Sequence, residues 1–209
     1  MHYMVRRTLL VITALLLSAA AHAEIVQGRD YRVLTPARAT TSAGKIEVVE
    51  FFSYGCPHCA EFHPSLSKWV AALPSETAFV RVPVSFGRRE WGQLVRAFYA
   101  LEATGDLAKL DVPLFEAIHA ERKPLFNEES LAAWIAQKGG NAPKFREAFN
   151  SFDVSRKSSQ AEQLSRDYQV SGVPQLAVNG KYLVLGQNYA DMLRIASELL
   201  EKERTAAKR

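Results

Sequence analysis

Hydrophobic residues follow two different spacings along this chain, and each spacing predicts a kind of element. Residues 45–52 form an apolar run rich in β-branched and aromatic side chains, bounded by Gly44 and Gly55, which predicts a strand. Residues 78–86 alternate in side-chain character and predict a second strand, which Pro83 should keep short or mark near its end.

Two further strand signals lie near the ends of the chain. Residues 31–35 predict a short first strand. Between residues 172 and 185, two apolar runs flank Asn179-Gly180, a dipeptide that is a strong short-range signal for a β-hairpin.

Elsewhere, apolar residues recur every three or four positions and predict helices. One helix follows Cys56, and Pro64 should kink or break it. The middle of the chain predicts helices from Trp91 to Gly105, after Pro113, from Asn127 to Gly139, and around residues 145–149. A polar helix over 154–168 and an amphipathic helix through residues 192–200 follow. We expect Trp91, Trp134 and Phe145 to serve the core and no chemistry.

The order of these elements predicts the architecture. Strand, helix and strand are followed by a helical block, a helix, a hairpin and a last helix. Such an order predicts a mixed sheet flanked by helices, with the middle helices inserted where the two halves join.

The N-terminus predicts an export signal. Arg6 and Arg7 precede a 13-residue apolar stretch, residues 9–21, and Ala21-His22-Ala23 supplies a small-x-small cleavage pattern. A membrane anchor is the alternative, but a spanning helix needs about 20 apolar residues. We therefore expect cleavage after Ala23 and a soluble, exported mature protein.

Charge argues against a nucleic-acid partner. The chain has 26 basic and 22 acidic residues, and removal of Arg6 and Arg7 leaves a net charge of +2. That balance is too weak to predict nucleic-acid binding, and we interpret the basic C-terminal residues as a solvated tail.

Cys56 and Cys59 are the only cysteines, in the sequence Cys-Pro-His-Cys directly after the predicted strand over 45–52. Two thiols at this spacing in an exported protein predict thiol–disulfide exchange. If Cys56 begins the helix, the unpaired amides of the first turn favour its thiolate, and Pro57 suits the first helical position. His58 would stabilise that thiolate further, or be a solvent-facing turn residue. The pattern predicts an exposed, acidic Cys56 and a buried, resolving Cys59.

Two other positions leave alternatives open. Glu50 is the one acid among Val48, Val49, Phe51 and Phe52, and it faces either solvent or the interior. If buried, it could accept and return the Cys59 proton.

Val173-Pro174 is either a simple strand edge or a cis bond that presents the backbone of Val173 to an extended peptide. On the second reading Pro57, Val173 and Pro174 belong to a substrate-binding surface.

At this point the chain resembles the bacterial periplasmic disulfide oxidoreductases of the DsbA type, within the thioredoxin superfamily. The segments that carry the resemblance are residues 50–59, 112–116, 172–174 and 178–182. The resemblance spans nearly the whole mature chain, and Cys-Pro-His-Cys is far more specific than two cysteines at that spacing.

The resemblance implies an α/β thioredoxin fold, a central mixed sheet flanked by helices, with an inserted all-helical domain. We expect residues 1–23 to be the signal peptide, 24–87 and 154–209 the two parts of the thioredoxin-like domain, and 88–153 the insert.

The same resemblance implies that Cys56 is the nucleophile, Cys59 the resolving thiol, Glu50 a buried acid and Pro174 cis. It also implies reduced exported polypeptides as substrates in the periplasm. Reoxidation would come from a quinone-coupled inner-membrane oxidase of the DsbB type. We expect no cofactor.

Two rival functions remain. A disulfide isomerase or reductase would share the cysteines, but related isomerases resemble dimers with a separate N-terminal domain, and we expect a monomer. A metal-binding module could use Cys56, Cys59 and His63, with His58 adjacent. A structural zinc site wants four ligands, usually from two segments, so we expect no metal and a surface position for His63.

Overall fold

The strand β2 (Ile46–Phe52) lies inside a five-stranded sheet in the computed structural model, which describes residues 24–207. It pairs in parallel with β3 (Thr77–Pro83) and antiparallel with β4 (Gln175–Val178). The strand order is β1-β5-β4-β2-β3, with β1 at Tyr31–Val33 and β5 at Tyr182–Val184. The mixed sheet that the element order predicts is confirmed.

The predicted hairpin joins β4 to β5. Asn179 and Gly180 have φ angles of 51° and 65°, and the Lys181 amide donates to the Val178 carbonyl oxygen at 3.0 Å. This left-handed backbone favours Asn and Gly. A Cβ on Gly180 would also collide with the carbonyl oxygen of Arg38, so the turn needs glycine there.

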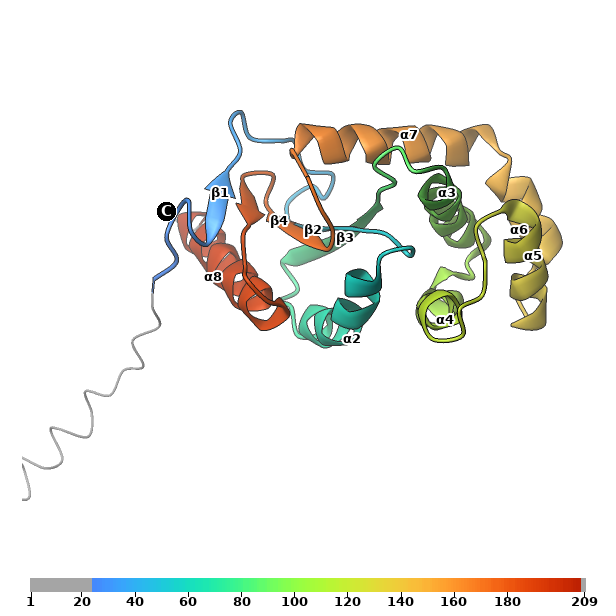
Figure 1. Cartoon of the computed structure of the whole chain (residues 1–209). Helices are drawn as coiled ribbons and strands as arrows, with labels where there is room; N and C mark the ends of the chain where they lie inside the picture. The colour runs from blue at the N-terminus through green and yellow to red at the C-terminus, as the bar shows by residue number, and fades with distance from the viewer. Residues whose placement is uncertain (1–23, 208–209) are drawn as a thin grey trace, which may run out of the picture.

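Helices cover both faces of the sheet (Figure 1). α2 (Pro57–Ala71) and α8 (Tyr189–Ala207) pack on one face, where Phe62, Leu66 and Leu199 surround Val48. α7 (Phe152–Asp167) runs across the other face, where Tyr168, just past its end, contacts Phe51. Because side chains alternate along a strand, Val48, Glu50 and Phe52 face α2, whereas Glu47, Val49 and Phe51 face α7.

Four further helices gather at one end of the sheet (Figure 1). They are α3 (Arg89–Thr104), α4 (Leu107–His119), α5 (Glu128–Gln137) and α6 (Ala142–Phe149). Their shared core includes Leu101, Leu114, Trp134 and Phe145, all buried as expected. It continues to Phe52, Cys56 and Cys59, so the helical part packs directly against the two cysteines.

Both prolines lie inside helices, so a break at Pro64 and a helix start after Pro113 were the wrong expectations. α2 has no break at Pro64, which lies inside the helix between the buried residues Phe62 and Leu66. α4 begins at Leu107 and contains Pro113, instead of starting after it. In both cases tertiary packing on the adjacent turns outweighs the missing backbone donor.

The predicted signal peptide, residues 1–23, lies outside the described residues. The division of the chain at residues 87 and 153 stays a prediction. α7 complicates it, because this helix leads from the helical part back over the sheet.

Candidate active site

Cys56 lies where the strand β2 gives way to the helix α2. Its backbone is extended (φ −95°, ψ 117°), and Pro57 is the first residue of the helix. The Cys56 amide donates to the Ser53 carbonyl oxygen at 3.1 Å, and the Cys56 carbonyl accepts from the Cys59 amide at 3.1 Å. Cys56 is therefore the N-cap residue, with its sulfur beside the unpaired amides of the first turn.

The expectation of an exposed Cys56 was wrong. Its relative exposure is only 5%, while Cys59 is fully buried at 0%. The Cys56 sulfur lies 3.4 Å from the carbonyl oxygen of Val173, which accepts from it when Cys56 is protonated, so a segment far along the chain covers it. Gly55 lies against Trp91, and a Cβ on Gly55 would lie 2.5 Å from the indole nitrogen. The site is therefore a closely packed surface.

The pKa values of the two thiols are shifted in opposite directions. A hydrogen bond from the Cys59 thiol lowers the pKa of Cys56 to about 6, and the backbone amides of Cys59 and His58 contribute in the same direction. Burial raises the pKa of the Cys59 thiol far above its ordinary value, and the neighbouring Cys56 raises it further. At neutral pH the pair therefore holds one thiolate, on Cys56, and one thiol, on Cys59.

His58 lies on the surface beside Cys56. Its side chain is 70% exposed, and Nδ1 lies 3.3 Å from Glu61 Oε2 and 3.4 Å from the Tyr189 hydroxyl. The charge of His58 is the smallest of the named influences on the pKa of Cys56, below that of its backbone amide. The histidine side chain thus has a weaker effect on the thiolate than the backbone around it.

Of the other residues predicted to form the substrate surface, Val173 lies against the same sulfur. Pro57 is exposed, Val173 and Pro174 are half-buried, and the bond between them is cis. The structure therefore brings Val173 to Cys56, and Pro57 and Pro174 are the chain neighbours of these two residues.

Glu50 is buried, with 1% relative exposure, on the face of β2 that α2 covers. Arg81 is its direct neighbour on β3, and Nε of Arg81 donates to Glu50 Oε2 at 2.7 Å. Glu50 Oε1 is buried with no hydrogen-bond partner among residues 24–207. Burial raises the pKa of the Glu50 carboxyl, although the charge of Arg81 opposes the rise. Glu50 also contributes to the raised pKa of Cys59.

Asp111, on α4, completes this buried cluster. Both of its oxygens accept from Arg81 Nη1, at 2.7 and 2.8 Å, and the Tyr54 hydroxyl donates to Oδ1 in a short hydrogen bond. His63 Nε2, on α2, lies 3.3 Å from Oδ2. His63 is thus not a surface histidine as predicted: its side chain is 12% exposed, and burial lowers its pKa.

Sequence reasoning missed Arg81, Asp111 and Tyr54. One signal was available for Arg81, which is the charged residue in an otherwise apolar strand directly opposite Glu50. No comparable signal marks Asp111, because a single acid in an amphipathic helix usually faces solvent.

Across residues 24–207 no group of three or more His, Cys, Asp or Glu side chains lies close enough to hold a metal ion. His63, which the metal hypothesis needed, pairs with Asp111 instead.

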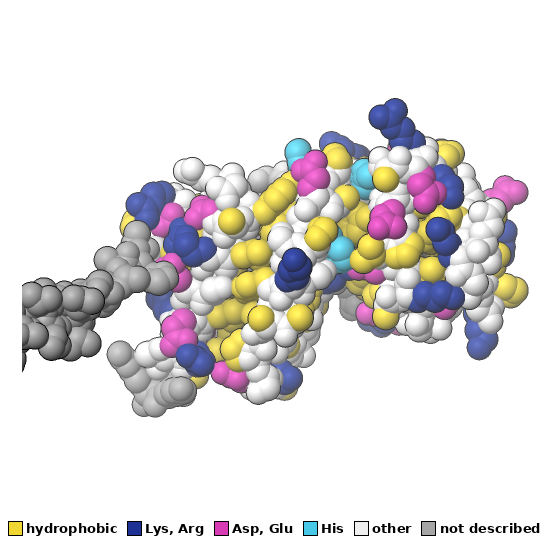
Figure 2. Space-filling view, turned by 90° about the horizontal axis from the view of Figure 1, so that it is seen from below, with side chains coloured by type: hydrophobic (Ala, Val, Ile, Leu, Met, Phe, Trp, Pro, Cys, Tyr) yellow, Lys and Arg dark blue, Asp and Glu magenta, His cyan; other side chains and the backbone are white. Residues whose placement is uncertain are grey.

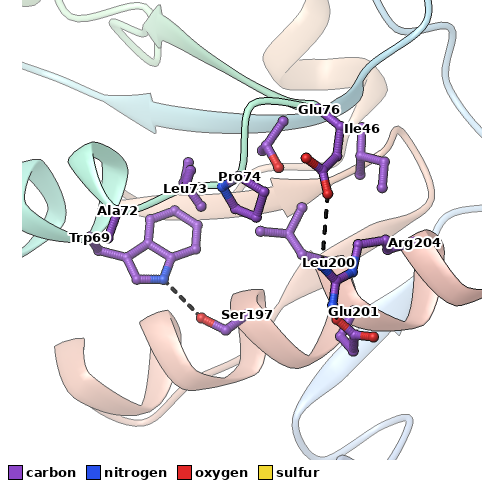
Figure 3. A pocket seen from close by; sticks show the side chains of 11 residues that line it. Ile46, Trp69, Ala72, Leu73, Pro74, Glu76, Ser197, Leu200, Glu201 and Arg204 are labelled. Atoms are coloured by element: carbon purple, nitrogen blue, oxygen red, sulfur yellow. Dashed lines mark hydrogen bonds and ion pairs between the residues drawn. The ribbon is translucent and has the colours of Figure 1, made fainter.

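A separate pocket of about 280 Å³ lies near the end of α2 that is remote from Cys56. Figure 3 shows Ile46, Leu73 and Leu200 lining it, with Trp69 donating to Ser197 at 2.8 Å. Figure 2, which views the molecule from below the orientation of Figure 1, shows hydrophobic side chains gathered on that face. The pocket contains none of the predicted site residues.

None of the helices within residues 24–207 has the length and apolar character needed to cross a membrane.

Comparison with known proteins finds one family. The model of the DSBA-like thioredoxin domain matches residues 47–197. The thiol:disulfide interchange protein DsbA of Pseudomonas syringae pv. tomato is 40% identical over 195 residues, covering 92% of this chain and 91% of that protein. Its namesake from Pseudomonas aeruginosa is 37% identical over 212 residues and the full length of both.

Solved structures give the same result. The crystal structure of Pseudomonas aeruginosa DsbA is similar to this chain with a TM-score of 0.85 at 39% identity, covering 88% of this chain and 97% of that one. The oxidoreductase DsbA of Xylella fastidiosa gives a TM-score of 0.82 at 35% identity, over 87% and 98% of the two chains.

Proposed function

The chain belongs to the DSBA-like thioredoxin family and is a thiol–disulfide oxidoreductase, and from this premise we propose that it donates its Cys56–Cys59 disulfide to proteins newly exported to the periplasm. Its substrates are proteins that exchange thiols and disulfides. We further propose that a quinone-coupled inner-membrane oxidase of the DsbB type restores the disulfide, as the family resemblance implies.

The proposed reaction begins from the disulfide form. A substrate thiolate attacks the Cys56 sulfur, the Cys56–Cys59 bond breaks, and Cys59 leaves as a thiolate that takes up a proton. A second substrate thiolate then attacks the substrate sulfur of the mixed disulfide and releases Cys56 as a thiolate. Two electrons pass from the substrate to the enzyme, and the substrate gains one disulfide.

The observation that carries the donor direction is the acidity of Cys56. A thiolate with a pKa of about 6 is a good leaving group, and its stabilisation favours the reduced enzyme over the disulfide. His58 would add a smaller stabilisation from the surface. Val173, Pro174 and Pro57 would hold the extended substrate chain beside Cys56.

Glu50 is the proposed proton carrier for Cys59. Cys59 must receive a proton when it leaves, and its strongly raised pKa makes an unprotonated Cys59 costly. The raised pKa of Glu50 makes this carboxyl better able than an ordinary glutamate to hold a proton and pass it to Cys59, directly or through water.

The test is the equilibrium redox potential against glutathione. We expect a value more oxidising than about −180 mV, which is typical of disulfide isomerases. A potential near that of reductases would contradict the donor role, and efficient rescue of scrambled ribonuclease without added oxidant would favour an isomerase. Titration of the reduced protein by thiolate absorbance should show Cys56 ionising near pH 6.

A further inference from the structure

One face of α4 holds the segment that leads into the two cysteines. Asp111, Phe115 and His119 follow one another at four-residue spacing, which places them on the same side of the helix. Asp111 accepts from the Tyr54 hydroxyl, while His119 Nε2 donates to the Tyr54 carbonyl at 2.7 Å. The Phe115 ring packs against Tyr54 with the centroids 4.7 Å apart. Tyr54 lies two residues before Cys56, so α4 fixes the start of the active site.

The charges in this cluster do not balance. Two carboxylates, Glu50 and Asp111, share the single guanidinium of Arg81, which donates Nε to one and Nη1 to the other. Arg81 also lies over the Phe52 ring, 3.9 Å from its centroid, and 14% of its side chain is exposed. Two buried negative charges against one positive charge are unfavourable, and a proton held within the cluster relieves the excess.

Asp111 is the better stabilised anion of the two carboxylates. It receives two hydrogen bonds from Arg81 and one from Tyr54, and it faces His63 from α2. Glu50 receives one hydrogen bond and has a buried oxygen with no partner among the described residues. The proton therefore belongs on Glu50, the carboxyl closer to Cys59.

We propose that Asp111 is a positioning residue that keeps Glu50 protonated beside Cys59. By binding the guanidinium of Arg81, Asp111 weakens the attraction between Arg81 and an ionised Glu50. The inference rests on the proposed role of Glu50 and deepens it. The inserted helices then have a direct part in the chemistry of the thioredoxin-like part, because one of their carboxylates sets the charge state of a group on β2. Asp111 itself contacts neither cysteine.

The groups that face Glu50 and Arg81 come from four segments. They are Cys59 and His63 on α2, Tyr54 in the loop before Cys56, Arg81 on β3 and Asp111 on α4. A groove between α2, β3 and α4 reaches His63, Arg81 and Asp111 from solvent, which gives the cluster a route for proton exchange with water.

The test measures the titration of the Glu50 carboxyl directly. Carbon-13 NMR of the reduced protein with labelled glutamate carboxyls records the titration of each glutamate. The signal that is lost in Glu50→Gln belongs to Glu50. The pH midpoint of that signal is then compared between wild type and Asp111→Asn. We expect the midpoint to fall by about one pH unit in Asp111→Asn, because Arg81 then attracts Glu50 alone and the nearby negative charge is gone. Glu116→Gln, which removes an exposed carboxylate from the same helix, should leave it unchanged.

A midpoint that is unchanged or raised in Asp111→Asn would overturn the inference. Should that variant fail to fold, Asp111→Ser removes the same charge and keeps a small acceptor for Tyr54, and the same fall is expected. The kinetic profile provides a second readout: exchange with a dithiol peptide should begin to slow about one pH unit lower in Asp111→Asn than in wild type. A wild-type protein that exchanged no disulfides would defeat the proposed function, whereas the carboxyl titration would still decide the role of Asp111.

Discussion

Glu47 and Glu50 are two buried glutamates on the same strand, and their surroundings differ completely. Both lie on β2, with relative exposures of 2% and 1%. They are three residues apart, so they point to opposite faces of the sheet. Residue type, element and burial are therefore the same, and only the partners differ.

Glu47 is held by neutral donors from a nearby loop. Its Oε2 accepts from the amides of Thr41 and Ser42 at 2.8 and 3.0 Å. The hydroxyls of the same two residues donate to it at 2.7 and 2.9 Å. These four hydrogen bonds satisfy the carboxylate locally and tie the loop to the sheet.

Glu50 has a single hydrogen-bond donor, the charged Arg81, and shares it with Asp111. Its pKa is raised by burial, and the charged groups that act on it, Arg81 and Asp111, come from β3 and α4. A buried carboxylate surrounded by hydrogen-bond donors serves the fold, whereas one that competes for a cation can gain and lose a proton. The comparison explains why only one of the two is suited to act beside Cys59.

Among the variants that test this comparison, removal of Arg81 should have the largest effect on the free energy of unfolding. Arg81→Met leaves Glu50 and Asp111 buried without a cation, and we expect a loss of about 3–5 kcal/mol in the free energy of unfolding at pH 7. Glu50 has a higher pKa in the folded than in the unfolded chain. The folded state thus binds the proton more tightly, and stability falls as pH rises through the window above the ordinary value of 4.5.

The loss in Arg81→Met should therefore be smaller at pH 5 than at pH 8, measured by urea unfolding at both values. Arg89→Met, which removes an exposed arginine at the start of α3, controls for the change in net charge. Equal losses at the two pH values would show that the carboxyls keep the same charge throughout.

Glutamine at each position should give opposite results. Glu47→Gln weakens hydrogen bonds to a charged acceptor and should cost about 1–3 kcal/mol, while leaving the rate of disulfide exchange unchanged. Glu50→Gln replaces a protonated buried carboxyl with a neutral amide of similar shape and should cost about 1 kcal/mol or less, yet slow the step in which Cys59 leaves, because the amide cannot pass on a proton. Urea unfolding and stopped-flow exchange with a dithiol peptide measure the two effects. If Glu50→Gln proved the more destabilising change and exchanged at the wild-type rate, Glu50 would be structural like Glu47.

A smaller effect is expected in the loop that holds Glu47. Thr41→Val removes one hydroxyl donor but keeps the backbone amide, and should lower the free energy of unfolding by about 1 kcal/mol. Thr40→Val, at the exposed neighbouring position, is the matched control and should have little effect. Both variants should exchange disulfides at the wild-type rate. A change in rate for Thr41→Val alone would link the Glu47 side of the sheet to the active site.

Local patterns predicted most of the elements and the redox pair. The apolar run before Cys56 and the helical spacing after it placed the two cysteines at a strand-to-helix junction, and the Asn179-Gly180 turn placed the hairpin. These signals act between residues that are close in sequence, so they survive in the folded chain. Pro113 misled for the same reason, since its local preference was overruled by packing around it.

The burial of Cys56 could not be predicted in this way. Val173, which covers its sulfur, is 117 positions away in sequence. Helix position alone suggested an exposed thiol, and only the approach of this distant segment shows that the thiolate is enclosed.

The amino-acid sequence is enough to show which chemistry is available: two cysteines at a helix start, Pro57 and His58 between them, and Glu50 in the strand before. The tertiary structure alone decided how that acid behaves. Glu50 faces inward because of the sheet's register, and Arg81, Tyr54 and Asp111 reach it from separate elements. The physical reason is that helix and strand signals depend on neighbours in the chain, whereas the protonation of a buried group depends on every charge and donor packed around it, wherever in the chain they originate.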